Sequence, residues 1–217
     1  MIDKASERFT IDLDRQRTKF IYLRLRFLVL DKYYPMFTLL GQSLGSMVLG
    51  LEAMLKFIPT VYFETTGYAF TYPLFHYFAG VPVCCYTHYP TISTDMLETV
   101  VQQTHSFNNR RMISRSRFLT SCKLKYYKLF AKLYSLCGRC ACCIMVNSTW
   151  TQGHINQIWS LVYRTRIVYP PCDVENFKEI FNDKQHDENF YISSVAQFRP
   201  EKNHQLQVRS FARFLQK

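Results

Sequence analysis

Acidic residues are missing from the middle third of this 217-residue chain: none occurs between Glu98 and Asp173. The same stretch is rich in lysine and arginine, and the whole chain carries a net charge of +11. A surface of one sign attracts nucleic acid, an anionic membrane surface or a phosphorylated substrate. We expect no nucleic-acid partner, because no recognised nucleic-acid-binding motif accompanies the charge.

Glycine and proline are also scarce, with 7 and 8 residues, which excludes a low-complexity or disordered chain. Hydrophobic residues make up 48% of the sequence and charged residues 20%, which is too polar for a bundle of membrane spans. Residues 1–17 are polar and mixed in charge, so we expect no signal peptide. Residues 33–51 form a long uncharged segment and are the one candidate for a membrane span. Gln42, Ser43 and Ser46 within it favour a buried or membrane-grazing helix over a membrane span.

Eight cysteines occur, and four of them form the cluster Cys137-x-x-Cys140-x-Cys142-Cys143. A structural zinc site needs a second spaced pair of ligands, and the sequence offers only isolated cysteines beyond the cluster. We therefore expect reduced cysteines that pack as small hydrophobic residues and no metal site. Free thiols in this number fit a cytosolic environment.

Helical and strand patterns alternate along the chain. Apolar runs that predict strands occur at 61–65, 83–87, 144–147 and 166–169, between helical patterns at 37–57, 70–79, 110–138 and 148–161. This alternation predicts an α/β fold with a parallel sheet covered on both faces. We expect a first domain over residues 1–180, a linker over 181–189 and the start of a second domain over 190–217.

The second domain opens with an apolar run from Tyr191 that is typical of a buried strand, and residues 205–215 have a helical pattern. Arg199 and Lys202 lie in the turn between them. Backbone N–H groups at a helix N-terminus favour anions, and two added cations make this turn a candidate phosphate or diphosphate site.

Ligands of open parallel sheets bind beyond the carboxyl ends of the strands, which selects Thr66 and Gly67 after the first strand and residues 88–94, with Tyr89 and Thr91, after the second. The most polar of these turns begins at His88, whose ring can hydrogen-bond a sugar hydroxyl or a phosphate. The alternative is a structural histidine bonded to the backbone. Glu64 ends another strand and is a weaker candidate. The sequence contains no nucleophile elbow, P-loop, paired carboxylates or histidine metal triad.

Six segments together carry a resemblance to a known family. They are TLLGQSLGS (38–46), GYAF (67–70), HYPTISTDML (88–97), VNSTWT (146–151), YPPCDV (169–174) and QFRPEKNH (197–204). The chain resembles the GDP-mannose-dependent α-1,2-mannosyltransferases of the dolichol-linked oligosaccharide pathway, over nearly all of residues 20–217. These transferases add the fourth and fifth mannoses to the N-glycan precursor on the cytosolic face of the endoplasmic reticulum membrane.

The resemblance implies a glycosyltransferase B-type fold, of which this chain holds most of an N-terminal Rossmann-like domain plus the first strand and helix of the second. It implies a retaining transfer with no cofactor and no essential metal. His88 matches a histidine near the transferred sugar, and Lys202 matches a lysine on the donor diphosphate. Arg199 is the candidate second cation, because Ala196 and Gln197 stand where related transferases have Gly-Arg. The implied partners are GDP-mannose, a dolichyl-diphosphate-linked oligosaccharide, the membrane surface and other mannosyltransferases of the pathway.

The glycine-rich loop and the acidic donor motif of such transferases are not found in this sequence, so we expect the chain to be inactive by itself. One alternative function is another nucleotide-sugar transferase of the same fold. A second is a non-catalytic membrane-docking module, because the basic residues of 110–138 alternate with aromatic and aliphatic ones.

Overall fold

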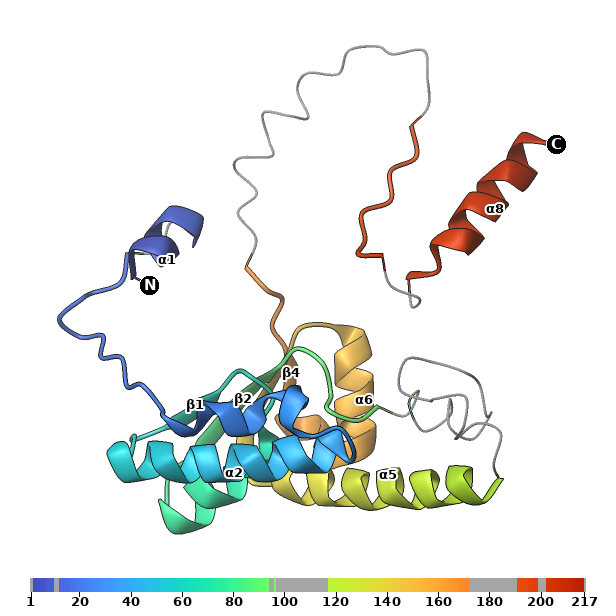
Figure 1. Cartoon of the computed structure of the whole chain (residues 1–217). Helices are drawn as coiled ribbons and strands as arrows, with labels where there is room; N and C mark the ends of the chain where they lie inside the picture. Colours follow the sequence, from blue (N-terminus) through green and yellow to red (C-terminus); the bar gives the residue numbers. More distant parts are fainter. Residues whose placement is uncertain are drawn as a thin grey trace. The chain divides into compact units, whose positions relative to one another are not determined.

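The computed structural model describes residues 2–9, 12–93, 96, 117–171, 191–198 and 202–216. The chain divides into two compact units, Met1–Cys172 and Asp173–Lys217 (Figure 1). The predicted linker, residues 181–189, lies outside the described residues.

The first unit alternates helices with strands. In chain order its elements are α1 (Ile2–Phe9), the 3-10 helices η1 (Leu25–Val29) and η2 (Asp31–Tyr33), α2 (Thr38–Lys56), β1 (Tyr62–Glu64), the 3-10 helix η3 (Ala69–Thr71), the π-helical turn η4 (Leu74–Phe78), β2 (Val83–Thr87), α5 (Arg117–Gly138), β3 (Ala141–Val146), α6 (Thr149–Trp159), the 3-10 helix η5 (Val162–Arg164) and β4 (Thr165–Ile167).

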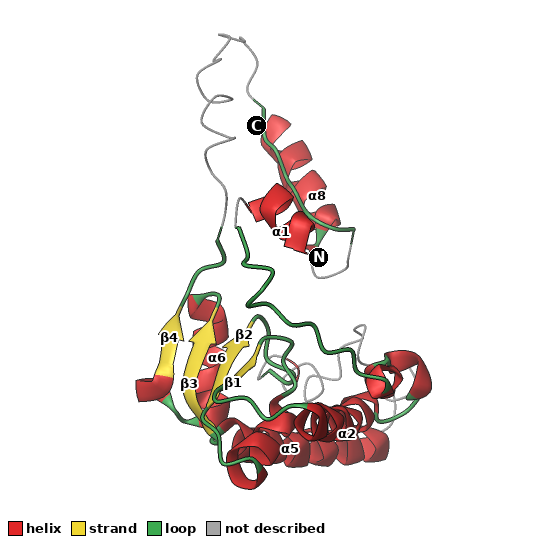
Figure 2. Cartoon of the chain, turned by 90° about the vertical axis from the view of Figure 1, so that its left-hand side faces the viewer, coloured by secondary structure: helices red, strands yellow, loops and turns green. Residues whose placement is uncertain are grey.

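The four strands form one parallel sheet in the order β1-β2-β3-β4. Right-handed crossovers that always step in the same direction return on the same side of a sheet. The helices that connect the strands therefore cover one face, and Figure 2 shows α6 behind the strands with no helix in front of them. The expected parallel α/β architecture is confirmed. The expectation that both faces are covered is wrong for the described residues.

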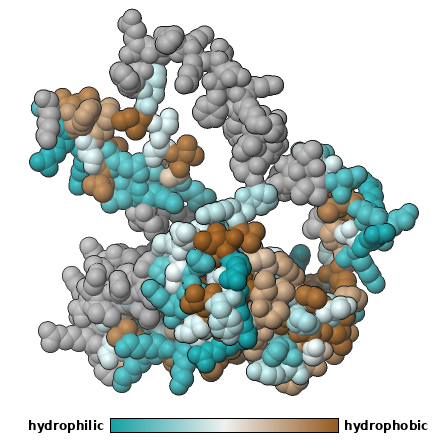
Figure 3. All heavy atoms as spheres, turned by 180° about the vertical axis from the view of Figure 1, so that it is seen from behind, coloured by the Kyte–Doolittle hydropathy of each residue, from teal (hydrophilic) through white to brown (hydrophobic). Residues whose placement is uncertain are grey.

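Side-chain burial along the strands agrees with this one-sided cover. Val83, Cys85 and Thr87 of β2 are buried, whereas Cys84 and Tyr86 between them are only half-buried. On the uncovered face Phe63 of β1 is 53% exposed. Apolar side chains also reach the surface seen in Figure 3, where brown patches lie among teal ones. The core consequently lies between the sheet and its single helical layer.

Large aromatic side chains fill that core. Trp159 of α6 is fully buried and lies against Tyr134 of α5, with 5.2 Å between ring centroids. Tyr62 of β1 stacks on Phe75 of η4 at 3.6 Å. Aromatic rings bury much apolar area per residue, so a few of them hold α5, α6 and η4 to the sheet.

Several predicted elements differ in detail, and the first and fourth strands are shorter than expected. The helix expected over residues 70–79 is short and irregular, because Pro73 cannot donate a backbone hydrogen bond and Ala79 N–H bonds Leu74 five residues back, at 3.2 Å. The third strand starts at Ala141 rather than at Ile144. Of the predicted helix 110–138, residues 117–138 are described and form α5.

Helix α2 packs through small residues. Ser43, Ser46 and Gly50 are buried toward the core. On a second face, an added Cβ at Gly45 would meet the carbonyl oxygen of Leu28 at 2.0 Å, so the chain segment before α2 lies directly on the helix. Gly45 therefore allows this close approach of two backbones.

A carboxylate fixes the same segment to α2. Backbone N–H groups of Arg24 and Leu25 both donate to Glu52 at 2.8 Å, and Lys56 Nζ donates at 2.6 Å. The Arg24 amide, the Lys56 ammonium and the Leu25 amide together lower the pKa of Glu52 to about 2. Glu52 is therefore ionised at neutral pH and holds residues 22–29 against the helix.

In the part of the chain that the structure describes, α2 alone is long and apolar enough to cross a membrane, by length and composition. A core helix passes the same test. Two faces of α2 are packed on protein, and the expectation of a buried or membrane-grazing helix stays a prediction.

In the second unit, α8 (His204–Leu215) confirms the predicted helix. Asn203 caps it, because its side chain accepts a hydrogen bond from Leu206 N–H at 3.3 Å. The strand expected from Tyr191 is not formed, since residues 191–198 have no regular secondary structure. A strand needs a hydrogen-bonded neighbour, and the described residues of this unit contain no second strand.

We predict that alanine substitutions at two helical glycines differ in their effect on the free energy of unfolding. Gly138→Ala would place a Cβ 2.3 Å from the Trp159 ring, so we expect it to lower the free energy of unfolding by about 1–3 kcal/mol. Gly153→Ala in α6 meets nothing within 4 Å and is expected to be neutral or stabilising, by up to about 1 kcal/mol. Urea denaturation of both variants measures the difference, and equal effects would contradict this packing.

Candidate functional site

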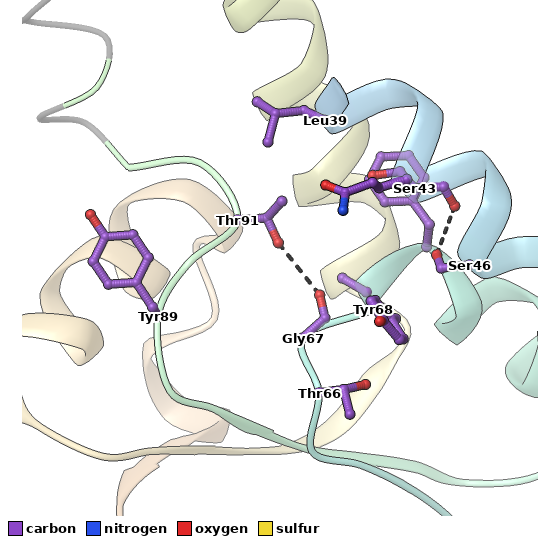
Figure 4. Close-up of a pocket in the computed structure, with 11 residues that line it drawn as sticks. Leu39, Ser43, Ser46, Thr66, Gly67, Tyr68, Tyr89 and Thr91 are labelled. Atoms are coloured by element: carbon purple, nitrogen blue, oxygen red, sulfur yellow. Dashed lines mark hydrogen bonds between the residues drawn. The ribbon is translucent and has the colours of Figure 1, made fainter. Parts of the chain in front are cut away.

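A pocket lies beyond the carboxyl ends of β1 and β2 and is closed by α2 (Figure 4). Its volume is about 150 Å³. Hydroxyl, amide and aromatic side chains make up most of its wall, and none of its residues is charged. The lining residues are Leu39, Gln42, Ser43, Ser46, Thr66, Gly67, Tyr68, Ala69, Phe70, Tyr89 and Thr91.

The turn after β1 is held by a buried carboxylate. Glu64 is 4% exposed, and its oxygens accept hydrogen bonds from the N–H groups of Thr66 and Gly67, at 2.7 and 3.0 Å, and from the Thr66 hydroxyl. The Tyr72 hydroxyl donates to the same carboxylate at 3.2 Å. Gly67 has a φ of +95°, a conformation that glycine adopts without strain. Glu64 thus positions the turn and does not face the pocket as a reactant.

Burial keeps the neighbouring phenols protonated. Desolvation, with a smaller contribution from the Glu64 charge, raises the pKa of Tyr62 to about 12. Desolvation also raises the pKa of Tyr72 well above its usual value. Both hydroxyls therefore remain hydrogen-bond donors at neutral pH, and Tyr72 can hold the Glu64 carboxylate.

The loop after β2 forms the second wall. Thr91 N–H donates to the buried Tyr134 hydroxyl at 3.4 Å, and the Thr91 hydroxyl donates to the Gly67 carbonyl at 3.4 Å. Figure 4 shows this second bond joining the two turns. Ile92 and Ser93 are fully buried and anchor the loop. The pocket is therefore built from two turns that are bonded to each other.

His88 is exposed and does not line the pocket, although its neighbour Tyr89 does. The His88 ring packs edge-on against Tyr86, with 4.8 Å between centroids. The Thr151 hydroxyl shares its single proton between the His88 carbonyl, at 3.3 Å, and Asn147 Oδ1, at 2.7 Å. The backbone at the end of β2 is thus tied to the start of α6.

The cysteine cluster does not form a metal centre among the described residues, where no three His, Cys, Asp or Glu side chains come together. Burial raises the pKa of Cys137 to about 12 and that of Cys85 to about 12. Metals and electrophiles react with the thiolate, so these protonated thiols are poor ligands and poor nucleophiles.

The predicted donor residues belong to the second unit. Lys202 is exposed and lies just before the Asn203 cap of α8. Arg199 lies outside the described residues.

Sequence patterns located part of this pocket. Thr66, Gly67, Tyr89 and Thr91 were expected because they follow strands. Ser43 and Ser46 were missed as site residues, although small polar residues within an otherwise apolar helix were the available signal. Helical periodicity shows that such residues share a face but not which turn that face meets.

Comparison with known proteins gives a family for the sequence. A family model described as "ALG11 mannosyltransferase N-terminus" matches residues 1–159. A human protein named "GDP-Man:Man(3)GlcNAc(2)-PP-Dol alpha-1,2-mannosyltransferase" is 51% identical over 218 residues, covering 100% of this chain and 44% of the human protein.

Relatives with the same name occur in distant organisms. The protein from Dictyostelium discoideum is 47% identical and that from Kluyveromyces lactis 39%, with 100% and 99% of this chain covered. The matches cover 44% and 36% of those two proteins, so the chain spans less than half the length of these curated relatives. No solved structure matches it.

We predict that Glu64 is essential to the shape of the pocket. Glu64→Ala leaves the buried Tyr72 hydroxyl and the part-buried N–H groups of Thr66 and Gly67 without their acceptor, and we expect a loss of about 2 kcal/mol or more in the free energy of unfolding. Amide hydrogen exchange at Thr66 and Gly67 should accelerate. Asp12→Ala is the control, because Asp12 is exposed. Unchanged exchange at both amides would refute the role of Glu64.

Proposed function

Since the chain belongs to the ALG11 mannosyltransferase family, we propose that the full-length protein transfers mannose from GDP-mannose to a dolichyl-diphosphate-linked oligomannose, in α-1,2 linkage, during N-glycan precursor assembly. The observation that carries the proposal is the 51% identity to the human transferase over the whole of this chain. The chain contributes the acceptor side of a glycosyltransferase B-type enzyme and the start of its donor side, and by itself it is inactive.

The pocket supports an acceptor-side role for the first unit. A sugar ring carries hydroxyls around its edge and C–H groups on its faces, and the pocket offers hydroxyl, amide and aromatic side chains. His88 lies in the same loop as Tyr89 and Thr91, at the carboxyl edge of the sheet where ligands of parallel sheets bind. Its proposed role is a contact with the transferred mannose.

Lys202 and Arg199 have the proposed role of binding the donor diphosphate. Lys202 is exposed at the N-terminal end of α8, where its ammonium and the helix dipole both favour an anion. Charge-assisted hydrogen bonds to phosphate are among the strongest that proteins make. No metal ion is needed in this proposal, because the two cations neutralise the leaving diphosphate.

The proposed location is the cytosolic face of the endoplasmic reticulum membrane, where a lipid-linked acceptor is reached from the surface. Helix α5 exposes Lys125, Lys128 and Lys132, and Leu129 and Leu136 are exposed beside them. A helix face of this kind binds anionic headgroups and buries its apolar side chains among them. Other mannosyltransferases of the pathway are further candidate partners.

We expect two variants of the full-length protein to lose transfer. With GDP-mannose and a lipid-linked trimannosyl acceptor, the wild type should add two α-1,2-linked mannoses. Lys202→Ala should reduce the rate about 10- to 100-fold, because a charged hydrogen bond to phosphate is lost, and His88→Ala should reduce it strongly.

His204→Ala is the matched control, because His204 bonds the Gln197 carbonyl within its own unit, at 3.0 Å. Transfer from UDP-sugars instead of GDP-mannose would leave the fold standing and refute the donor assignment. No transfer from any donor would favour the docking-module alternative.

A charge reversal tests the membrane surface. Replacing Lys125, Lys128 and Lys132 by Glu should abolish co-sedimentation of the chain with vesicles that contain anionic lipid, because each cation contributes about 1 kcal/mol near such a surface. The control reverses three other exposed cations, Lys19, Arg209 and Arg213, and so changes the net charge equally. Equal binding by both triple variants would exclude α5 as the docking surface.

A further inference from the structure

Two large aromatic side chains are exposed side by side at the carboxyl edge of the sheet. Tyr89, in the turn after β2, is 57% exposed, and Trp150, in the first turn of α6, is 43% exposed. Their rings stack with 5.1 Å between centroids and 29° between planes. The Trp150 ring meets the His154 ring edge-on at 4.1 Å, and His154 is buried. His154 therefore packs against the Trp150 ring on the protein side, and both rings of the pair remain partly exposed to solvent.

The backbone on both sides of the pair is fixed. The carbonyl of His88, which precedes Tyr89, accepts the hydrogen bond of Thr151, which follows Trp150. Thr151 is 1% exposed, and its N–H donates to the Ser148 hydroxyl that caps α6. The turn that carries Tyr89 and the first turn of α6 that carries Trp150 are thus joined, and the two rings stack on each other, so the surface is partly ordered before a ligand arrives, which lowers the entropic cost of binding.

Tyr89 is also one of the residues that line the pocket, so the aromatic pair and the hydroxyl-lined pocket share this residue (Figure 4). Thr91 follows two residues later and presents its side chain toward Gly67, on the pocket side. The loop after β2 therefore carries both a residue of the aromatic pair and a hydroxyl of the pocket wall.

The chemistry of this surface fits an uncharged sugar ring, which has apolar C–H faces and hydroxyl groups around its edge. No charged residue lines the pocket, so it offers nothing to neutralise a diphosphate. An aromatic face suits the C–H face of a pyranose, while the nearby Thr66, Thr91 and Ser43 suit its hydroxyls. A purine base also stacks on aromatic rings, which makes guanine the competing ligand.

We propose that Tyr89, backed by Trp150, is an aromatic platform that binds a mannopyranose ring of the acceptor oligosaccharide and directs its hydroxyls into the pocket. The inference rests on the proposed transferase function and adds a residue that sets acceptor affinity. Since the platform belongs to the acceptor side, its loss raises the KM for the acceptor and leaves the KM for GDP-mannose unchanged.

The first test measures both KM values in the full-length enzyme. Tyr89→Ala should raise the KM for the lipid-linked trimannosyl acceptor about tenfold, the scale of one lost stacking contact, while Tyr89→Phe should behave like the wild type. Tyr163→Ala is the matched control, because Tyr163 is 67% exposed on η5 and lines no part of the pocket.

The kinetic outcomes distinguish a failure of the proposed function from a failure of the aromatic platform alone. Failure of the wild type to transfer mannose would refute the proposed function itself. Normal transfer with an unchanged acceptor KM in Tyr89→Ala would refute the platform alone. An equal defect in Tyr89→Phe would show that the hydroxyl acts rather than the ring, and this would also overturn the platform.

The second test distinguishes the two ring ligands in the 217-residue chain. The chain has two tryptophans, of which Trp150 is exposed and Trp159 is fully buried, so a ligand on the platform changes the emission of Trp150. The free pentasaccharide Man3GlcNAc2 should change this emission and GDP should not, and Trp150→Phe should abolish the change. A response to GDP and none to the pentasaccharide would assign the platform to guanine and overturn the proposal.

Discussion

The four parallel strands follow one another across the sheet in chain order, so every right-handed crossover must return on the same side. This constraint places η3, η4, α5 and α6 in a single layer. It also brings the turns after β1 and β2 to the same edge. Helix α2, which precedes β1 in the chain, contacts η3 and belongs to the same layer. Its residues form one wall of the pocket. The position of the pocket thus follows from the order of the strands.

The same constraint leaves one sheet face without helices among the described residues. Phe63 and Cys142 are exposed on it, whereas parallel sheets usually have both faces buried. The curated relatives are more than twice as long as the part that matches this chain. An apolar open face is consistent with a unit that belongs to a larger protein.

Helix α2 has 19 residues and three faces with different surroundings. One face is made of small residues that approach the core and line the pocket, and a second is held to residues 22–29 by Glu52. The third face is apolar and exposed, with Leu44, Val48, Leu51 and Leu55 at helical spacing. This outward face explains why the helix has the hydropathy of a membrane span although two of its faces pack on protein. Composition alone therefore cannot assign it.

The alternation of helices and strands could be predicted from the sequence, because apolar periodicity and capping residues act over a few neighbours. The sequence also identified Thr66, Gly67, Tyr89 and Thr91 as strand-end residues, and its motifs pointed to the family. Three features became visible only in the folded chain: Glu64 anchors a turn, His88 lies beside the pocket rather than in its wall, and Tyr89 stacks on Trp150. The strand that the sequence predicted from Tyr191 is not formed, because a strand also needs a neighbouring strand that the local pattern does not specify. Each of these features depends on contacts between residues that are distant in the chain, and local patterns carry no information about which distant segments meet.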